Sequence, residues 1–303
     1  MTKIYNKILG KFLKKTFSFW QRLGFHITPV HFYESIPDTR KLKDSLWETY
    51  SELVGIDINE KKQLELLSFF VSNFQKEYKD FPLNKTLIPY QYYINNGGFE
   101  SVDGEILYCT IRYFKPKRII EIGSGNSTYL SAQAILENKK EGKGDCELII
   151  IDPYPNKILE KGFPGLSKLI KEEVQKIDLS EFGKLKENDI LFIDSSHVLK
   201  IGSDVQYEYL EILPRLNKGV IVHMHDIFLP AEYRKEWISK NYIFYTEQYL
   251  LQAFLTFNNV FEVLWAGSYM HLTYPQLLEK TFNSYNSKKV WPGSFWIRRK
   301  TQK

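Results

Sequence analysis

The chain has 303 residues, of which 43% are hydrophobic and 16% aromatic, enough to bury one or two cores at roughly 100–200 residues per domain. The net charge of +5 is small and charges of both signs are mixed along most of the sequence, which does not favour a nucleic-acid-binding protein. Two cysteines, Cys109 and Cys146, imply no disulfide framework and fit a reducing, cytoplasmic location. We recognise no signal peptide and no apolar run near the roughly 20 residues that span a membrane.

The first 22 residues depart from this even distribution of charge. Basic residues occur here without any acidic residue, at Lys3, Lys7, Lys11, Lys14, Lys15 and Arg22. Apolar residues recur between them at helical spacing and are followed by aromatic ones: Ile4, Ile8, Leu9, Phe12, Leu13, Phe17, Phe19 and Trp20. This pattern predicts a basic amphipathic helix. Such a helix either makes peripheral contact with an anionic membrane surface or packs its apolar stripe on this protein or on a second subunit of a homo-oligomer.

Residues 1–90 are predicted to be an N-terminal helical and aromatic extension, a lid or an interface, ahead of a second domain at 91–303. One helix of this extension has a clear apolar stripe, formed by Leu64, Leu67, Phe70, Val71 and Phe74. We therefore expect a helix across these positions.

The middle of the chain alternates short apolar runs with helical patterns. Strands are predicted at 118–122, 148–151, 173–177, 190–193 and 219–223, with helices at 127–137 and 203–213 between them. Near-continuous apolar runs such as LIII and ILFI suit strands that are buried on both faces of a parallel sheet. A helix at 248–258 and strands at 261–265 and 294–298 complete the pattern. The expected fold is α/β: a doubly wound, mostly parallel, seven-stranded Rossmann-like sheet with an antiparallel edge, plus the N-terminal helical extension.

The first strand of this sheet runs into a glycine turn, in the sequence IIEIGSGNST at 119–128. Gly123 and Gly125 permit a tight turn and a close ligand approach because neither has a Cβ, and Ser127 or Thr128 is expected to cap the helix that follows. A dinucleotide site would have a third glycine at position 128. Glu121, just before the turn, would also repel a pyrophosphate. The turn therefore favours a cationic ligand over NAD.

EIGSGNST resembles the first motif of class I S-adenosylmethionine-dependent methyltransferases. S-adenosylmethionine carries a sulfonium and an ammonium group and no phosphate. The resemblance implies that the motif binds the methionine end of this co-substrate, through Glu121, Gly123, Ser124, Gly125, Asn126 and Ser127.

Acidic residues follow three further strands. Asp152 ends the second strand, where a carboxylate accepts hydrogen bonds from ribose hydroxyls in proteins of this kind. After the third strand the family often places a polar group against the adenine, so Asp178 or Gln175 is a candidate; capping of a helix is the alternative for Asp178. Asp194, after the fourth strand, is also expected at the co-substrate, whereas Asp204 is expected to cap a helix.

Two short motifs lie where polar groups meet at the carboxyl edge of the sheet: DSSH at 194–197 and HD at 225–226. Together they resemble a methyltransferase subgroup, with bacterial members, that carries D-x-x-H after the fourth strand and H-D after the fifth. The resemblance extends over about residues 90–300.

These motifs leave three roles open. His197 or His225 is the general base that deprotonates a hydroxyl, with Asp194 or Asp226 as its partner. Alternatively, Asp194, Asp226 and His197 bind a divalent metal, which is not favoured because Ile227 follows Asp226 where a further oxygen ligand is usual. The third alternative is a purely structural role.

The predicted function is S-adenosylmethionine-dependent methyl transfer, with O-methylation of a small-molecule or glycan hydroxyl. The alternatives are a degenerate methyltransferase fold that acts as a scaffold at a membrane surface, and an NAD-dependent oxidoreductase. An RNA methyltransferase is weaker still, because no basic and aromatic recognition module is visible.

Overall fold

The computed structural model describes residues 10–300, which divide into two compact units. The first comprises residues 10–49 together with Arg234–Phe244, and the second comprises Tyr50–Tyr233 and the chain from Tyr245 onward. No helix within residues 10–300 is long and apolar enough to cross a membrane.

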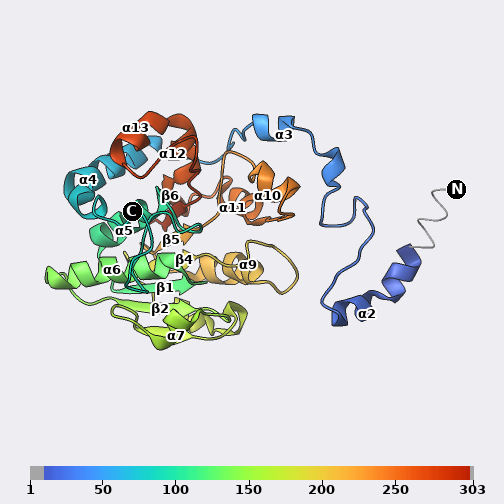
Figure 1. Ribbon diagram of the computed structural model, residues 1–303, viewed down its shortest axis with the longest axis horizontal. Helices are drawn as coiled ribbons and strands as arrows, with labels where there is room; N and C mark the ends of the chain where they lie inside the picture. The colour runs from blue at the N-terminus through green and yellow to red at the C-terminus, as the bar shows by residue number, and fades with distance from the viewer. Residues whose placement is uncertain (1–9, 301–303) are drawn as a thin grey trace. The chain divides into compact units, whose positions relative to one another are not determined.

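The second unit is built on a seven-stranded sheet in the order β3-β2-β1-β4-β5-β7-β6. Its strands are β1 (Arg118–Ile122), β2 (Glu147–Ile151), β3 (Lys168–Ile170), β4 (Ile190–Ile193), β5 (Ile221–Met224), β6 (Phe261–Ala266) and β7 (Phe295–Arg299). Strands β1 to β5 pair in parallel, and β7 pairs antiparallel with both β5 and β6. Figure 1 shows β2, β1, β4, β5 and β6 one above another from the bottom of the view. The predicted Rossmann-like sheet with an antiparallel edge is confirmed.

The third strand differs from the prediction. Residues 173–177, expected to be a strand, contain the 3-10 helix η2 (Val174–Lys176), and β3 lies earlier in the chain. Val174 is buried and Ile177 is half-buried, three residues apart, which is the repeat of one 3-10 turn. In β3, Ile170 pairs with Ile151, and its carbonyl accepts the N–H of Asp152 at 3.0 Å.

Helices flank the sheet and connect its strands. In the second unit they are α4 (Glu60–Tyr78), α5 (Asp103–Phe114), α6 (Asn126–Lys140), α7 (Lys157–Lys161), α8 (Leu179–Phe182), α9 (Asp204–Tyr207), α11 (Glu247–Leu255), α12 (Gly267–Thr273) and α13 (Pro275–Thr281). The helix expected at 203–213 is divided: after α9 the chain continues as the π-helix η3 (Glu208–Ile212) and the 3-10 turn η4 (Leu213–Arg215). Pro214 in η4 has no N–H to continue an α-helix.

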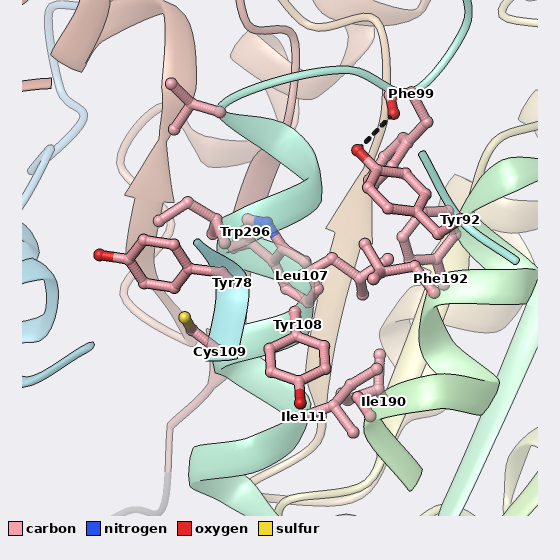
Figure 2. Close-up of a cluster of buried hydrophobic side chains, with 14 of the residues drawn as sticks. Tyr78, Tyr92, Phe99, Leu107, Tyr108, Cys109, Ile111, Ile190, Phe192 and Trp296 are labelled. Atoms are coloured by element: carbon pink, nitrogen blue, oxygen red, sulfur yellow. Dashed lines mark hydrogen bonds between the residues drawn. The ribbon is translucent and has the colours of Figure 1, made fainter. Parts of the chain in front are cut away.

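Alternate residues of the strands feed two hydrophobic clusters, one on each face of the sheet. Ile119 and Phe192 join one cluster, whereas Ile120 and Leu191 join the other. Figure 2 shows part of the first, where the hydroxyl of Tyr92 donates a hydrogen bond of 2.9 Å to a backbone carbonyl. Burial on both faces explains why these strands read as continuous apolar runs.

The predicted helix with an apolar stripe is confirmed as α4, and it belongs to the second unit. The side-chain amide of Gln63 in α4 accepts the N–H of Ala266, at the end of β6, at 2.8 Å. Leu67 and Phe70 of the same helix are fully buried. Helix α4 therefore packs on the sheet, and the second compact unit begins at Tyr50. This boundary does not coincide with the domain boundary that the sequence predicts at residue 90.

The first unit contains α2 (Phe17–Arg22), the 3-10 turn η1 (Thr39–Lys41), α3 (Ser45–Glu48) and α10 (Lys235–Ser239). Lys235 of α10 lies 2.7 Å from Asp44, just before α3, and over the ring of Trp47. Residues 10–15 are helical and α2 follows, so the described part of the predicted basic helix is present. Its earlier positions Lys3, Ile4, Lys7, Ile8 and Leu9 lie outside the described residues.

Candidate functional site

The turn after β1 brings the ends of three strands together at Gly123. Its φ of +83° is in the left-handed region, and a Cβ there would overlap the backbone carbonyl of Asp194. The N–H of Gly123 donates to the backbone carbonyl of Ile151, at the end of β2, at 3.0 Å. The N–H of Asp194, after β4, donates to the backbone carbonyl of Ile122, at the end of β1, at 2.9 Å. Gly123 thus lets the ends of β1, β2 and β4 converge at one edge of the sheet.

Gly125 has a different environment. Apart from Gly125 itself and its two chain neighbours, no described residue has an atom within 4 Å of the position that a Cβ would occupy there. The backbone at Gly125 is therefore open to approach, but Gly125 does not line the cavity described below, so its predicted contact with the co-substrate stays a prediction. Asn126 follows as the first residue of α6.

Glu121 lies behind the turn and braces it. Its side chain is fully buried, and Oε1 accepts hydrogen bonds from Ser127 at 2.6 Å and Thr128 at 3.0 Å. Thr128, in the first turn of α6, also accepts the N–H of Gly125 at 3.0 Å, so the N-cap residue of this helix is Gly125 and not Ser127 or Thr128. Burial, reinforced by the charges of Asp194 and Asp152, raises the pKa of Glu121 to about 8.

The second oxygen of Glu121 is buried and has no hydrogen-bond partner among residues 10–300. This oxygen leaves room for an added donor, but Glu121 is not among the residues that line the neighbouring cavity. Its predicted contact with the co-substrate therefore stays a prediction. The same holds for Asn126 and Ser127, which are also absent from the cavity lining.

A cavity of about 620 Å³ opens at the carboxyl ends of β1, β2 and β4, within the range of small-molecule sites. Four predicted residues line it together: Gly123, Ser124, Asp152 and Asp194. Lining residues also come from the segments after β3 and β4: Glu173, Val174, Gln175, Ser195, Ser196, Lys200, Gly202, Ser203 and Asp204. The cavity wall thus carries several carboxylates and the amine of Lys200.

Asp152 is oriented by two neighbours at the rim of this cavity. Its Oδ2 accepts the hydroxyl of Ser124, and its Oδ1 accepts the N–H of Tyr154 at 2.7 Å. Asp152 therefore forms a turn and also presents a carboxylate to the cavity, so the turn-forming and ligand-binding interpretations are compatible.

Asp178 is exposed, and it is not among the cavity-lining residues. Its carboxylate accepts the N–H of Ser180 at 2.8 Å and so caps α8, and the hydrogen bonds from Ser180 lower its pKa. This position favours the capping alternative. Gln175 does line the cavity, where its amide donates to the carbonyl of Gly202 at 3.2 Å.

The DSSH and HD motifs meet beside the cavity. Nε2 of His197 lies 3.2 Å from Asp194 and 3.6 Å from Asp226, and its Nδ1 lies 2.8 Å from Glu247. Nδ1 of His225 lies 3.4 Å from Asp194 and 3.7 Å from Asp226. The two imidazoles therefore share the same pair of aspartates.

The neighbouring carboxylates raise the pKa of both histidines. Burial opposes a charged imidazole, but the hydrogen bonds and charges of Asp194 and Glu247 outweigh it and raise the pKa of His197 well above its usual value. For His225, burial is outweighed by Asp194 and Asp226, and its pKa is also raised well above the usual value. His223 differs: burial lowers its pKa, and its ring stacks on Phe192 at 3.9 Å.

The two aspartates respond in opposite ways. Burial raises the pKa of Asp194, but His225 and His197 more than offset this, so its pKa is well below the usual range. For Asp226, burial dominates and its pKa is raised. Both side chains keep partial exposure, 29% and 20%, whereas the two histidines are almost fully buried. The aspartates are therefore the groups of this cluster that an added molecule can touch.

Residues 120–227 match a family model described as a methyltransferase domain. An uncharacterized protein of Archaeoglobus fulgidus is 34% identical over 180 residues, which are 56% of this chain and 78% of that protein. The chain belongs to the same family as this archaeal protein. The matched methyltransferase domain contains the glycine turn, Asp152, Asp194, His197, His225 and Asp226.

Three solved structures also align with the chain. An O-methyltransferase from Bacillus cereus, in complex with SAH, is 12% identical over 79% of this chain and 91% of its own, with a TM-score of 0.38. A methyltransferase of Thermobifida fusca YX, described as putative, is 14% identical over 83% and 97%, with a TM-score of 0.41. The apo structure of CmcI-N160 is 14% identical over 67% and 73%, with a TM-score of 0.34. At these TM-scores the alignments add nothing to the assignment of function.

Two acidic residues beside the candidate site are not predicted as site residues from the sequence. Asp103, in the first turn of α5, lies 3.7 Å from Nε2 of His225 and accepts the N–H groups of Gly293 and Ser294. Glu247, in the first turn of α11, lies 2.8 Å from Nδ1 of His197. An acid at a helix start looks ordinary in a sequence, so neither gives a local signal.

The predicted capping role of Asp204 holds only in part, because Ser203 is the N-cap residue of α9 while Asp204 accepts the N–H of Val205 at 2.9 Å. Ser203 caps α9 by accepting the N–H of Gln206, while Asp204 accepts the N–H of Ser196 at 2.9 Å and its hydroxyl at 2.6 Å. Asp204 thereby fixes the DSSH loop. Across residues 10–300, no group of three or more His, Cys, Asp or Glu is arranged to hold a metal ion.

Proposed function

We propose that this protein transfers a methyl group from S-adenosylmethionine to a hydroxyl of a small-molecule or glycan acceptor. The observation that carries the proposal is the cavity at the carboxyl edge of the sheet, where the glycine turn, Asp152 and Asp194 meet inside the matched methyltransferase domain. Ligands of open α/β sheets bind at this edge.

The cavity's own residues suit this co-substrate. Asp152, held by Ser124 and Tyr154, is placed to accept hydrogen bonds from vicinal ribose hydroxyls. Asp194 stays ionised because two imidazoliums stabilise it, so it can neutralise an ammonium or sulfonium group. When bound, S-adenosylmethionine supplies a methyl group that is already activated for in-line displacement. Acidic lining residues disfavour the pyrophosphate of NAD, although Lys200 also lines the cavity.

The contacts favour a different division of catalytic roles from the predicted histidine base. Both ring nitrogens of His197 face carboxylates at 2.8–3.6 Å, and these carboxylates raise its pKa, which favours the protonated imidazole. A protonated imidazole cannot accept the acceptor's proton. We therefore assign proton acceptance to Asp226, whose raised pKa makes it the better base of the two partly exposed aspartates. His197 and His225 hold that carboxylate in place.

Calorimetric titration with S-adenosylhomocysteine, with NAD as a parallel control, tests the donor assignment. Micromolar binding of the first and none of the second supports the proposal. Binding of neither would support the scaffold alternative, and tighter binding of NAD would support an oxidoreductase. Asp226→Asn then tests the base: turnover should fall at least about 100-fold while S-adenosylhomocysteine still binds.

A further inference from the structure

The first unit exposes an unusual number of aromatic and aliphatic side chains. None of residues 10–49 is buried. Between residues 10 and 33 the exposed apolar side chains are Phe12, Phe17, Phe19, Leu23, Phe25, Ile27, Val30, Phe32 and Tyr33. Phe32 and Tyr33 are 80% and 84% exposed, and their rings lie 4.2 Å apart. Contiguous exposed apolar side chains in a soluble protein indicate an interaction surface.

The same residues carry charge of one sign. Lys11, Lys14, Lys15 and Arg22 are exposed, and the first acidic residue of the whole sequence is Glu34. Lys11 and Lys14 line a hollow of about 600 Å³, together with the apolar side chains of Leu13 and Val30. Glu34 and Arg40 also line this hollow, and the guanidinium of Arg40 is paired with Asp38 at 2.7 Å. Amines and apolar groups therefore meet in one place.

We propose that residues 10–33, the N-terminal basic segment, bind the surface of a bilayer that contains anionic lipid. Aromatic and aliphatic side chains enter the boundary between headgroups and acyl chains, while lysines stay at the level of the phosphates. The hollow beside Lys11 and Lys14 offers both the charge and the apolar wall that a lipid headgroup and its glycerol need. This proposal is independent of the proposed methyl transfer.

Two other occupants explain less of the surface. A second copy of the chain on the same face would oppose lysines with lysines, which costs energy. A nucleic acid would pair with the lysines and stack on aromatic rings, but it would leave Leu23, Ile27 and Val30 in water. An anionic bilayer satisfies the charges and the aliphatic side chains together.

Vesicle co-sedimentation of the full chain tests the proposal. The vesicles are phosphatidylcholine alone, or phosphatidylcholine with about a third phosphatidylglycerol, at about 0.15 M ionic strength. We expect sedimentation with the anionic vesicles only. The triple change Lys11→Glu, Lys14→Glu, Lys15→Glu should weaken binding at least about tenfold. The matched control reverses Lys79, Lys85 and Lys143, which are exposed lysines of the second unit, and should bind like the unchanged protein.

A second variant separates insertion from simple charge attraction. Phe19→Ser, Phe25→Ser, Phe32→Ser keeps every lysine and should also weaken binding at least about tenfold. Because these side chains are exposed, all variants should keep the same thermal unfolding midpoint. The proposal is wrong if the full chain does not bind anionic vesicles, or if both lysine triples lose binding equally. It is also wrong if the segment binds single-stranded RNA while vesicle binding is absent.

Discussion

Nδ1 of His197 lies 2.8 Å from Oε2 of Glu247, a residue that is 50 positions later in the chain and fully buried. The start of α11, the helix to which Glu247 belongs, also holds the backbone of His197, because the N–H of Thr246 donates to the carbonyl of His197 at 2.9 Å. The left-handed φ of His197, +59°, is thus held by α11. The other carboxylate oxygen of Glu247 accepts the hydroxyl of Tyr209 at 3.0 Å.

Glu247→Gln should change the charge of His197 without disturbing the cavity wall. The neutral amide no longer stabilises the imidazolium, so the pKa of His197 should fall and turnover should drop. Folding should lose about 1–3 kcal/mol, because a buried charged hydrogen bond is weakened. Histidine titration by NMR measures the pKa, and S-adenosylhomocysteine affinity should change by less than about twofold. Glu211→Gln, at a half-exposed position of η3, is the control. An unmoved His197 titration would contradict this assignment.

Asp152→Asn and Asp178→Asn distinguish a ligand contact from a helix cap. Asp152 lines the cavity, so its change should weaken S-adenosylhomocysteine binding by about 10- to 100-fold, the equivalent of one or two good hydrogen bonds. Asp178 caps α8 outside the cavity, so its change should leave affinity alone and cost at most about 1 kcal/mol of folding free energy. Calorimetry and thermal unfolding measure the two effects. If Asp178→Asn weakened the binding and Asp152→Asn did not, the adenosine would instead bind near α8.

The two glycines of the turn should respond differently to alanine. A Cβ at Gly123 meets the Asp194 carbonyl at a positive φ, so Gly123→Ala should destabilise the fold by several kcal/mol. Gly125→Ala places its methyl group in open space, so the protein should fold normally and lose donor affinity. Urea unfolding and calorimetry check the pair. Normal donor binding by Gly125→Ala would mean that the co-substrate does not approach this backbone.

The sequence predicts those parts of the fold and site that depend on short-range patterns. β1 and β4 have the predicted bounds because each is an apolar run buried on both faces. The turn at Gly123 and the position of Asp152 directly after β2 follow from such runs. The strand predicted at 173–177 is wrong because two apolar residues three positions apart fit a short strand or a 3-10 turn equally well.

Long-range contacts explain the rest. His225 and Asp103 are joined only by tertiary packing, and α5 gives no sign of it except an acid in its first turn. His197 looks like a free base in the motif DSSH, because the sequence does not reveal that Glu247 occupies its second nitrogen. Charge networks of this kind depend on which loops lie next to one another in the folded protein. The sequence pattern predicts the strands that precede these loops, but not the contacts between the loops.

Glu121 predicts a pH dependence of stability. Its pKa is about 8 in the folded protein, against 4.5 for an ordinary glutamate, because the buried site disfavours the charged form. A group with a raised folded pKa stabilises most below the unfolded value, and this contribution is lost as pH rises toward the folded value. Between about pH 4.5 and pH 8 the folding free energy should therefore decline. Glu105, raised to about 7, contributes in the same direction.

Glu121→Gln should remove part of this decline, because glutamine stays neutral and still accepts hydrogen bonds from Ser127 and Thr128. Urea unfolding at a series of pH values compares the two proteins, and their difference in free energy should shift in favour of the variant as pH rises from about 4.5 to about 8. Glu187→Gln, at an exposed position, should leave the profile unchanged. If the pH profiles of Glu121→Gln and the unchanged protein are parallel, then a hydrogen-bond donor reaches the second oxygen of Glu121 and keeps its carboxylate ionised at neutral pH.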